Sequence, residues 1–381
     1  MVFRNLFWLM VASSLPIAVL GQSAPKVAPV PGDPLELATG QIHAIDSPAS
    51  RAAIVRILDH ARDSYALRSA GRAYDLKVEF TVDSGGQTEY DGDWKMEDVF
   101  DPAQGLQWKA KAPGSYAITR IFSKGMFFGD ETEDHIPLRL QEARAALFGP
   151  MPSAESVAHA SIRVSKAIYK GAPLTCVLLS GPKGGLATPG RRWDETEECI
   201  DPQTGLLRTH SQVPGRYFAY KYSTASHFAG HVLPGKVIVT EGGKTVTEIV
   251  VKSLTELPAS DPKLDPKLFT PTEEMKSKGH ATEMAQAQKI WRFAGQGKPA
   301  RGATIKPVCV FGLVTPAGQL VEAHSLQPSD PNSAVAVEDA KQINFSSPPF
   351  DPHPEQHFVF IIEKFVSSKQ AKTGNVVSAP D

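Results

Sequence analysis

Apolar and polar residues alternate with a period of two over much of the chain between residues 74 and 254. Leu76, Val78 and Phe80 alternate with polar neighbours, as in a strand with one buried face. Similar runs follow at intervals of roughly 8–12 residues, separated by turn sequences such as Asp-Ser-Gly-Gly at 83–86. This spacing is typical of a large antiparallel sheet or an open barrel.

Four segments carry helical spacing instead. In the first, Ser47 offers an N-terminal cap, and Ile54, Leu58 and Ala61 fall on one face. The four predicted helices are 47–67, 136–148, 282–293 and 333–343. Together the patterns predict an α+β fold: a large curved antiparallel sheet (a half-barrel) with packed helices, plus a small module of antiparallel strands and a helix.

Changes in pattern and in Pro and Gly content divide the chain into six expected parts. They are a signal peptide or anchor (1–21), a Pro-rich tether (22–46), a half-barrel domain (47–270), a linker with a helix (271–301), a small C-terminal module (302–366) and a disordered tail (367–381).

The amino terminus has the pattern of an export signal. Arg4 precedes an uncharged apolar run from Leu6 to Gly21, which is shorter than the roughly 20 residues of a membrane-spanning helix. Cleavage before Gln22 would release the chain into the periplasm. An uncleaved segment would instead anchor it in the inner membrane.

Composition indicates an ordinary folded chain with no preference for polyanions. Apolar residues make up 41% of the sequence and charged residues 21%, and the formal net charge is −1. Because no basic excess would attract phosphates, nucleic acid is not an expected partner.

The three cysteines predict one disulfide. Cys176 and Cys199 lie in two apparent strands joined by a Gly- and Pro-rich stretch at 181–190, so they can meet across an antiparallel pair. Two buried thiols are the alternative. Cys309 has apolar neighbours and is expected to be a buried free thiol.

Motifs for catalysis or metal binding do not form. Pro354 prevents His353 and His357 from sharing a helical face, and His227 and His231 lie between strands. The expectation is therefore a protein without a metal or cofactor, and not an enzyme.

Residues 74–270 resemble the LolA-type carriers that sort outer-membrane lipoproteins. The resemblance rests on the sequence Cys-Ile-Asp-Pro-Gln-Thr-Gly-Leu-Leu-Arg at 199–208 and the closing Leu-Phe-Thr-Pro at 268–271. A sheet curved around a helix leaves an apolar concavity that suits acyl chains, at about 0.8 kcal/mol per buried CH₂. The side chains that could line it are Phe80, Trp94, Trp108 and Phe127. The alternative is that these aromatic side chains fill an ordinary core.

Residues 306–366 look like the C-terminal domain of TonB-type energy transducers. The match lies in the apparent strand 308–314, the turn 316–318, the run 320–325, the helix ending at Phe345, and a final strand. The resemblance implies that the last strand is a sheet edge able to add an extended peptide. Its residues are Phe358, Val359, Phe360, Ile361 and Ile362. A simple folded cap is the alternative.

These features predict an exported, cell-envelope binding protein for a lipid or a lipidated partner, with a second module for a peptide or an outer-membrane receptor. One alternative is a TonB-type transducer or accessory protein in transmembrane transport at outer-membrane receptors. The other is a structural envelope scaffold.

Overall fold

The computed structural model describes residues 37–112, 114, 116–130, 135–181, 190–279, 287–293, 304–347 and 356–367. The predicted signal segment and most of the predicted tether and tail lie outside these ranges. No helix among the described residues is long and apolar enough to cross a membrane.

The described helices are α1 (Pro48–Ser64), α2 (Leu138–Phe148), α3 (Ala154–His159) and α4 (Ser333–Lys341), with short 3-10 helices η1 (Leu67–Ala70), η2 (Pro262–Leu264) and η3 (Pro266–Phe269). The described strands are β1 (Leu37–Thr39), β2 (His43–Ala44), β3 (Tyr74–Val82), β4 (Gly92–Asp101), β5 (Gly105–Lys111), β6 (Ala117–Ser123), β7 (Met126–Gly129), β8 (Ser161–Tyr169), β9 (Ala172–Ser180), β10 (Thr196–Ile200), β11 (Leu207–Val213), β12 (Arg216–Lys221), β13 (Ser226–Phe228), β14 (His231–Leu233), β15 (Lys236–Glu241), β16 (Lys244–Glu256), β17 (Lys276–Gly279), β18 (Ala287–Phe293), β19 (Thr304–Val314), β20 (Leu320–Ser325) and β21 (His357–Ser367).

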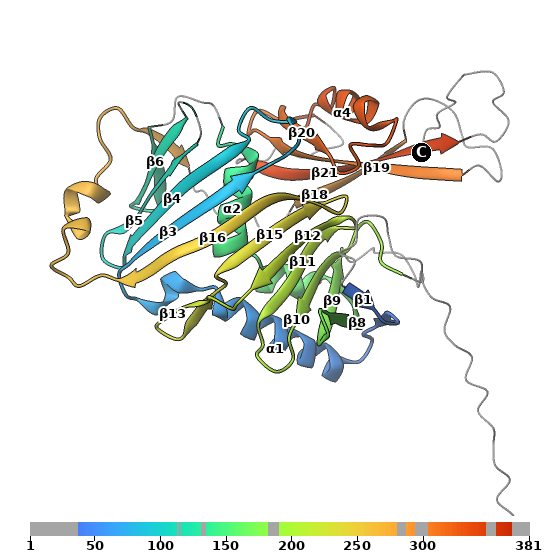
Figure 1. Ribbon diagram of the computed structural model, residues 1–381, viewed down its shortest axis with the longest axis horizontal. Helices are drawn as coiled ribbons and strands as arrows, with labels where there is room; N and C mark the ends of the chain where they lie inside the picture. Colours follow the sequence, from blue (N-terminus) through green and yellow to red (C-terminus); the bar gives the residue numbers. More distant parts are fainter. Residues whose placement is uncertain are drawn as a thin grey trace, which may run out of the picture.

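A 15-stranded sheet forms the large domain. Its order is β1-β8-β9-β10-β11-β12-β15-β16-β3-β4-β5-β6-β7-β17, and β2 pairs with β8 beside β1. The long strand β16 joins two antiparallel meanders, because it pairs with β15 on one side and with β3 on the other. Figure 1 shows the sheet curving around α1, with α2 between the sheet and the C-terminal strands. The predicted antiparallel curved sheet is therefore confirmed, and β1 and β2 extend it into the predicted tether.

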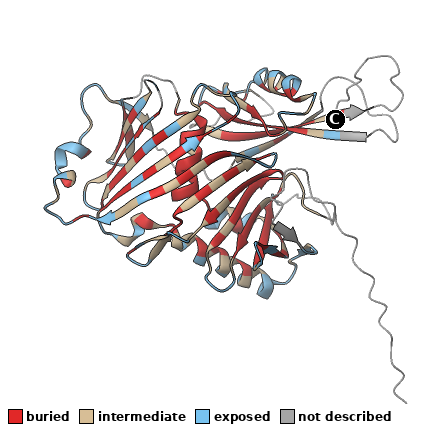
Figure 2. Ribbon diagram, in the orientation of Figure 1, coloured by how far each residue is buried: buried red, intermediate tan, exposed pale blue. Residues whose placement is uncertain are grey.

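The core of the large domain lies between the sheet and its helices. Helix α1 begins where Ser47 accepts a hydrogen bond from the Ser50 backbone N–H at 3.1 Å. Its Ile54, Leu58 and Ala61 are buried against the sheet, as their spacing predicts. The alternation of buried and exposed positions along the strands is visible in Figure 2.

The C-terminal module is a second sheet with the order β18-β21-β19-β20. On one face, Val359 and Ile361 pack with Ala336 of α4. On the opposite face, Phe358 and Phe360 belong to a core cluster shared with the large domain, whose other members include Leu138, Val213, Phe311 and Leu326. The module is therefore attached to the large domain through the apolar cluster on this second face.

Two sequence predictions about this module are wrong. Strand β21 is not a sheet edge, because it pairs with β18 on one side and with β19 on the other. Its residues Phe358 to Ile362 are 0–1% exposed, so they offer no free backbone to an added peptide. Residues 287–293 are not helical either; they form β18, whose backbone pairs in parallel with β21.

A buried ion-pair network lies at the junction of the two parts. It consists of Arg139 and Glu142 on α2, Arg216 on β12 and Glu241 on β15. Arg139 donates to Glu241 at 2.7 and 3.0 Å and to Glu142 at 2.8 Å, while Arg216 donates to Glu241 at 2.9 Å and also pairs with Glu142. The Arg216 guanidinium lies 4.0 Å over the Phe311 ring of the C-terminal module. Two acids and two bases thus balance one another beneath the small sheet.

Candidate functional site

The candidate site is a cavity of about 400 Å³ where the two parts of the chain meet. Helix α3 and the ends of β9, β10 and β11 form its large-domain walls, and β18 forms the wall on the side of the C-terminal module. We call it the junction cavity. Its lining residues are Pro152, Ser156, His159, Ala160, Leu179, Ser180, Gly181, Asp194, Thr196, Glu198, His210, Gln212, Ala287, Lys289 and Trp291.

Strand periodicity directs the key side chains into this cavity. Residues 287, 289 and 291 of β18 alternate with Ile290, which packs in the core of the small module instead. On the opposite wall, Glu198 of β10 and His210 of β11 are directly paired across the two strands. The turn at 201–205 joins the two strands, and its Asp201 side chain accepts a hydrogen bond from the Gln203 backbone N–H at 2.9 Å. A register shift between Cys199 and Ile200 separates this turn from the Glu198–His210 pair.

Glu198 and His210 form a buried hydrogen-bonded pair. His210 Nδ1 lies 2.8 Å from Glu198 Oε2, and Glu198 is 0% exposed. Burial raises the pKa of Glu198, and the nearby His210 opposes that shift only in part. The second carboxylate oxygen, Oε1, is buried without a hydrogen-bond partner. A buried oxygen of this kind is costly in an empty cavity and is a natural contact for a bound ligand.

Lys289 extends from β18 to the large domain. Its Nζ donates to the Asp194 carbonyl oxygen at 3.0 Å and to Thr196 Oγ1 at 3.3 Å, and both acceptors are uncharged. Burial, together with the nearby Arg191 guanidinium, lowers the pKa of Lys289 to about 7. The cavity therefore contains an amino group that no carboxylate contacts directly among the described residues, and this group is mainly charged only below about pH 7.

The replacement Lys289→Met is expected to stabilise the unliganded chain at low pH. The folded chain holds fewer protons on Lys289 than the unfolded chain between about pH 7 and the ordinary lysine pKa of 10.5. Stability of the wild type therefore rises with pH through this window, and the advantage of the variant is largest below it and vanishes above it. Urea unfolding from about pH 6 to about pH 10 measures this difference.

The matched control for that experiment is Lys341→Met, since Lys341 lies at the exposed surface of α4 with Glu338 as its partner. Its effect on stability should stay flat over the same range. A Lys289→Met difference that does not change with pH would show that the lysine is not held in an environment that disfavours its charge.

A second, much smaller cavity shares lining residues with the junction cavity and with the buried ion-pair network. Its volume is about 10 Å³, the space of roughly one water molecule. His210 and Gln212 line both cavities, and Glu142 and Tyr220 line the small one. Arg216 donates to the Gln212 side-chain oxygen at 2.5 Å. The network thus holds one wall of the junction cavity in place.

The four aromatic residues proposed from the sequence as cavity lining lie in the packed core instead. Phe80, Trp94, Trp108 and Phe127 are 1–6% exposed and belong to the main core cluster. The rings of Phe80 and Trp94 stack with centroids 5.3 Å apart, and Arg144 lies 4.1 Å over Trp108. None of the four lines the junction cavity. Their position therefore agrees with the alternative given by the sequence analysis, in which these side chains fill an ordinary core.

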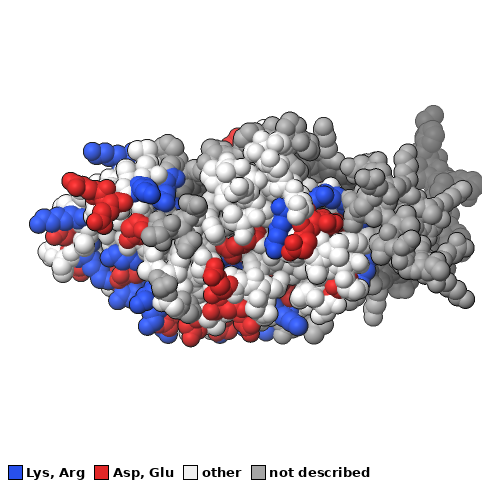
Figure 3. Space-filling view, turned by 90° about the horizontal axis from the view of Figure 1, so that it is seen from above, with Lys and Arg blue, Asp and Glu red and all other residues white. Residues whose placement is uncertain are grey.

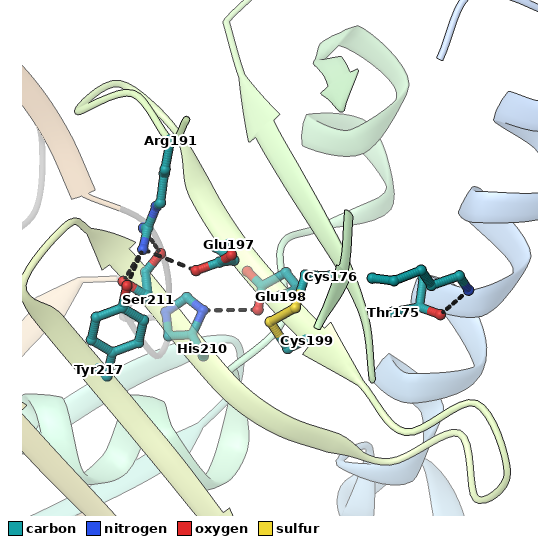
Figure 4. The surroundings of a disulfide bond; sticks show 10 residues. Thr175, Cys176, Arg191, Glu197, Glu198, Cys199, His210, Ser211 and Tyr217 are labelled. Carbon is teal, nitrogen blue, oxygen red and sulfur yellow. Dashed lines mark hydrogen bonds and ion pairs between the residues drawn. A yellow bond between two sulfur atoms is a disulfide. The ribbon is translucent and has the colours of Figure 1, made fainter. Parts of the chain in front are cut away.

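The predicted disulfide is confirmed. Cys176 on β9 and Cys199 on β10 face each other directly across the strands and are bonded, and Cys309 is a buried free thiol. Figure 4 shows the disulfide beside Glu197 and the Glu198–His210 pair. Along β10, Cys199 and Glu197 point to one face of the sheet and Glu198 to the other, so the disulfide fixes the strand that carries Glu198 without reaching the cavity.

One metal-like grouping occurs among the described residues, on the face away from the cavity. Ligand atoms of Cys176, Glu197 and Cys199 lie within 4.8 Å of one another. Both sulfurs are used in the disulfide, however, and Arg191 holds Glu197 at 3.1 Å. Thiolate ligands are therefore absent here in the oxidised chain.

The sequence predicted the large-domain strands of this site, but it predicted neither β18 nor the site residues. Glu198 and His210 occupy inward-facing positions of β10 and β11, where the alternation calls for apolar side chains. Charged residues at inward-facing strand positions were the signal in the sequence that could have indicated a site. Lys289 had no such signal, because its segment was predicted to be a helix.

Charge on the surface seen from above does not single out another site. Figure 3 shows acidic and basic side chains both present over this face.

Comparison with known proteins gives only distant structural neighbours. No family model matches the sequence, and no curated protein matches it. A LolA superfamily protein from Nitrosomonas europaea aligns over 57% of this chain and 96% of its own, at 10% identity and a TM-score of 0.34. An outer membrane lipoprotein-sorting protein domain from Vibrio parahaemolyticus aligns over 54% and 94%, at 7% identity and 0.32. A DUF1329 family protein from Desulfovibrio piger aligns over 59% and 98%, at 10% identity and 0.35.

These alignments assign neither a ligand nor a partner to the chain, because every TM-score is 0.35 or lower. One of these neighbours is described as a LolA superfamily protein. The resemblance of residues 306–366 to TonB-type transducers stays a prediction, since no family model matches the chain.

Proposed function

We propose that this chain is a cell-envelope binding protein that holds the apolar part of a lipid or lipidated partner in the junction cavity. The observation that carries the proposal is the cavity itself, about 400 Å³ in volume and shared between two parts of the chain. Its walls combine apolar side chains such as Leu179 and Trp291 with a few buried polar groups. This combination is typical of small-molecule sites, which commonly measure about 300–1,000 Å³.

The binding energy would come mainly from burying the hydrocarbon. Each CH₂ group transferred from water contributes about 0.8 kcal/mol, so a chain of ten buried groups offers about 8 kcal/mol before the costs of association. The buried polar groups would then orient the head of the ligand. We propose binding without chemical conversion, in line with the absence of a recognised catalytic motif in the sequence.

An envelope location is part of the same proposal. The amino-terminal segment has the pattern of an export signal, and the Cys176–Cys199 disulfide suits an oxidising compartment. Release into the periplasm requires cleavage near Gln22. The alternative function, a TonB-type transducer or accessory protein at outer-membrane receptors, requires that the segment stays as an anchor, so the amino-terminal residue of the exported protein discriminates between them.

Filling the cavity should weaken the binding of an apolar probe. Ala160 lines the cavity at the end of α3, and Ala160→Phe places a ring in the space meant for the ligand. We expect the variant to bind a fluorescent single-chain fatty-acid probe at least tenfold more weakly than the wild type, because the hydrocarbon loses several buried CH₂ groups. Fluorescence titration measures the dissociation constants.

The matched control is Ala158→Phe, which adds the same ring to an exposed position of the same helix. It should bind the probe as the wild type does. Equal binding by all three proteins would place the probe elsewhere, and no binding by the wild type would favour the scaffold hypothesis, which needs no ligand.

A further inference from the structure

Two side chains that line the junction cavity each have a polar atom whose hydrogen bonding is incomplete. Glu198 Oε1 is buried with no hydrogen-bond partner. Lys289 Nζ can donate three hydrogen bonds, and the described contacts use two of them, to Asp194 and Thr196. The two groups come from opposite walls, one from the large sheet and one from the C-terminal module. The charge of Lys289 reaches Glu198, because it lowers the pKa of that carboxyl against the larger effect of burial.

A single polar head group of a ligand could satisfy both atoms. Glu198 Oε1 needs a hydrogen-bond donor, and Lys289 needs an acceptor that preferably carries negative charge. A carboxylic acid offers both, since one of its oxygens can accept from Lys289 while the proton it shares with Glu198 lies between the two carboxyl groups. The pair of carboxyl groups then carries one negative charge, which the Lys289 ammonium balances.

Other lipid heads fit these atoms less well. A phosphodiester has negative charge but no donor for Glu198, so it would place two anions side by side. An amine supplies donors but leaves Lys289 facing another cation. An ester has acceptors only. The volume of about 400 Å³ also lies near the lower end of the range for ligand sites, which favours one hydrocarbon chain over two.

We infer that the junction cavity binds a single-chain fatty acid with its carboxyl group between Lys289 and Glu198. This inference rests on the proposed function, because it names the ligand class of the same cavity. It also gives β18 a role: the strand carries the cationic half of the head-group site from the C-terminal module to the large domain.

A competition experiment with the full chain tests the inference. The fluorescent probe is displaced in turn by palmitic acid, methyl palmitate, hexadecanol and hexadecylamine. Because a charge-assisted hydrogen bond is worth roughly tenfold or more in affinity, palmitic acid should displace the probe at least tenfold more tightly than each of the other three. Lys289→Met should reduce this preference to about threefold or less, because only the acid presents a negative charge to the lysine. Lys341→Met, at an exposed position of α4, should leave the preference unchanged.

Two results would overturn the inference and leave the proposed function standing. One is equal affinity for palmitic acid and methyl palmitate; the other is a preference for palmitic acid that Lys289→Met does not reduce. If the wild type binds neither the probe nor any of the four competitors, the proposed function fails as well. Circular dichroism of Lys289→Met checks that the variant is folded before its affinities are compared.

Discussion

Replacing Glu241 with glutamine is expected to lower the free energy of unfolding by about 3–5 kcal/mol. Glu241 is 4% exposed and accepts hydrogen bonds from both Arg139 and Arg216. Without its charge, two buried guanidinium groups are left with Glu142 as their remaining buried acid. A charge that is buried and unbalanced is costly, because the low dielectric of the interior weakens its solvation. Urea unfolding at neutral pH measures the loss.

The pH dependence provides a second check on this variant. Burial opposes the ionisation of Glu241, yet Arg139 and Arg216 outweigh it and lower its pKa from 4.5 to about 2. Ionised Glu241 therefore contributes to the free energy of unfolding. This contribution is fully present above about pH 4.5 and is lost as the pH falls toward 2. The difference between wild type and Glu241→Gln should therefore shrink over the same interval.

The control for Glu241 is Glu248→Gln on the neighbouring strand β16. Glu248 pairs with Lys236 at the exposed surface, where an ion pair contributes about 1 kcal/mol or less. An equal loss of stability in the two variants would contradict the account of the junction, because the network would then behave as an ordinary surface pair.

Removing the disulfide is expected to cost about 3 kcal/mol. Cys176 and Cys199 are 23 positions apart, and closing a loop of this length in the unfolded chain gives a stabilisation of about 3 kcal/mol in the chain-entropy description. The double variant Cys176→Ala with Cys199→Ala should show this loss in urea unfolding. Reductant should lower the wild type toward the same value.

The double variant is also the control for the reductant, which should leave its stability unchanged. An undiminished stability in the double variant would mean that the β9–β10 pair is already held by its backbone hydrogen bonds and packing. The cavity wall that carries Glu198 would then not depend on the disulfide.

Local patterns in the sequence predicted much of the large domain. The alternation at 76–82 became β3, the capped apolar stripe became α1, and the turn at 201–205 brought β10 against β11. These elements depend on neighbours that are close in the sequence or on a repeating buried face. Such signals are visible in a single sequence.

The C-terminal module was harder to predict because its pairings are distant. Strand β18 pairs with β21, far along the chain, and its own residues show no strong alternation of apolar and polar side chains. The position of β21 does have a signal in the sequence. Phe358 to Ile362 is an uninterrupted apolar run, which is typical of a strand covered on both faces. A solvent-facing edge strand would more often alternate.

The site itself depends on this distant pairing. Glu198 and His210 lie on strands that the sequence predicted, but the opposite wall comes from β18. Without the parallel β18–β21 pair, Lys289 and Trp291 could not be placed opposite them. The cavity is thus a consequence of how the C-terminal module packs on the large domain, which no local pattern contains.

Native mass spectrometry tests the central claim most directly. The chain would be exported to a bacterial periplasm, purified without detergent, and compared with Ala160→Phe prepared in the same way. We predict a reproducible added mass of single-chain lipid size on the wild type, lost on organic extraction and absent from the variant. A wild type that carries no added mass, and gains none on incubation with palmitic acid, would contradict the claim that the junction cavity binds an apolar ligand.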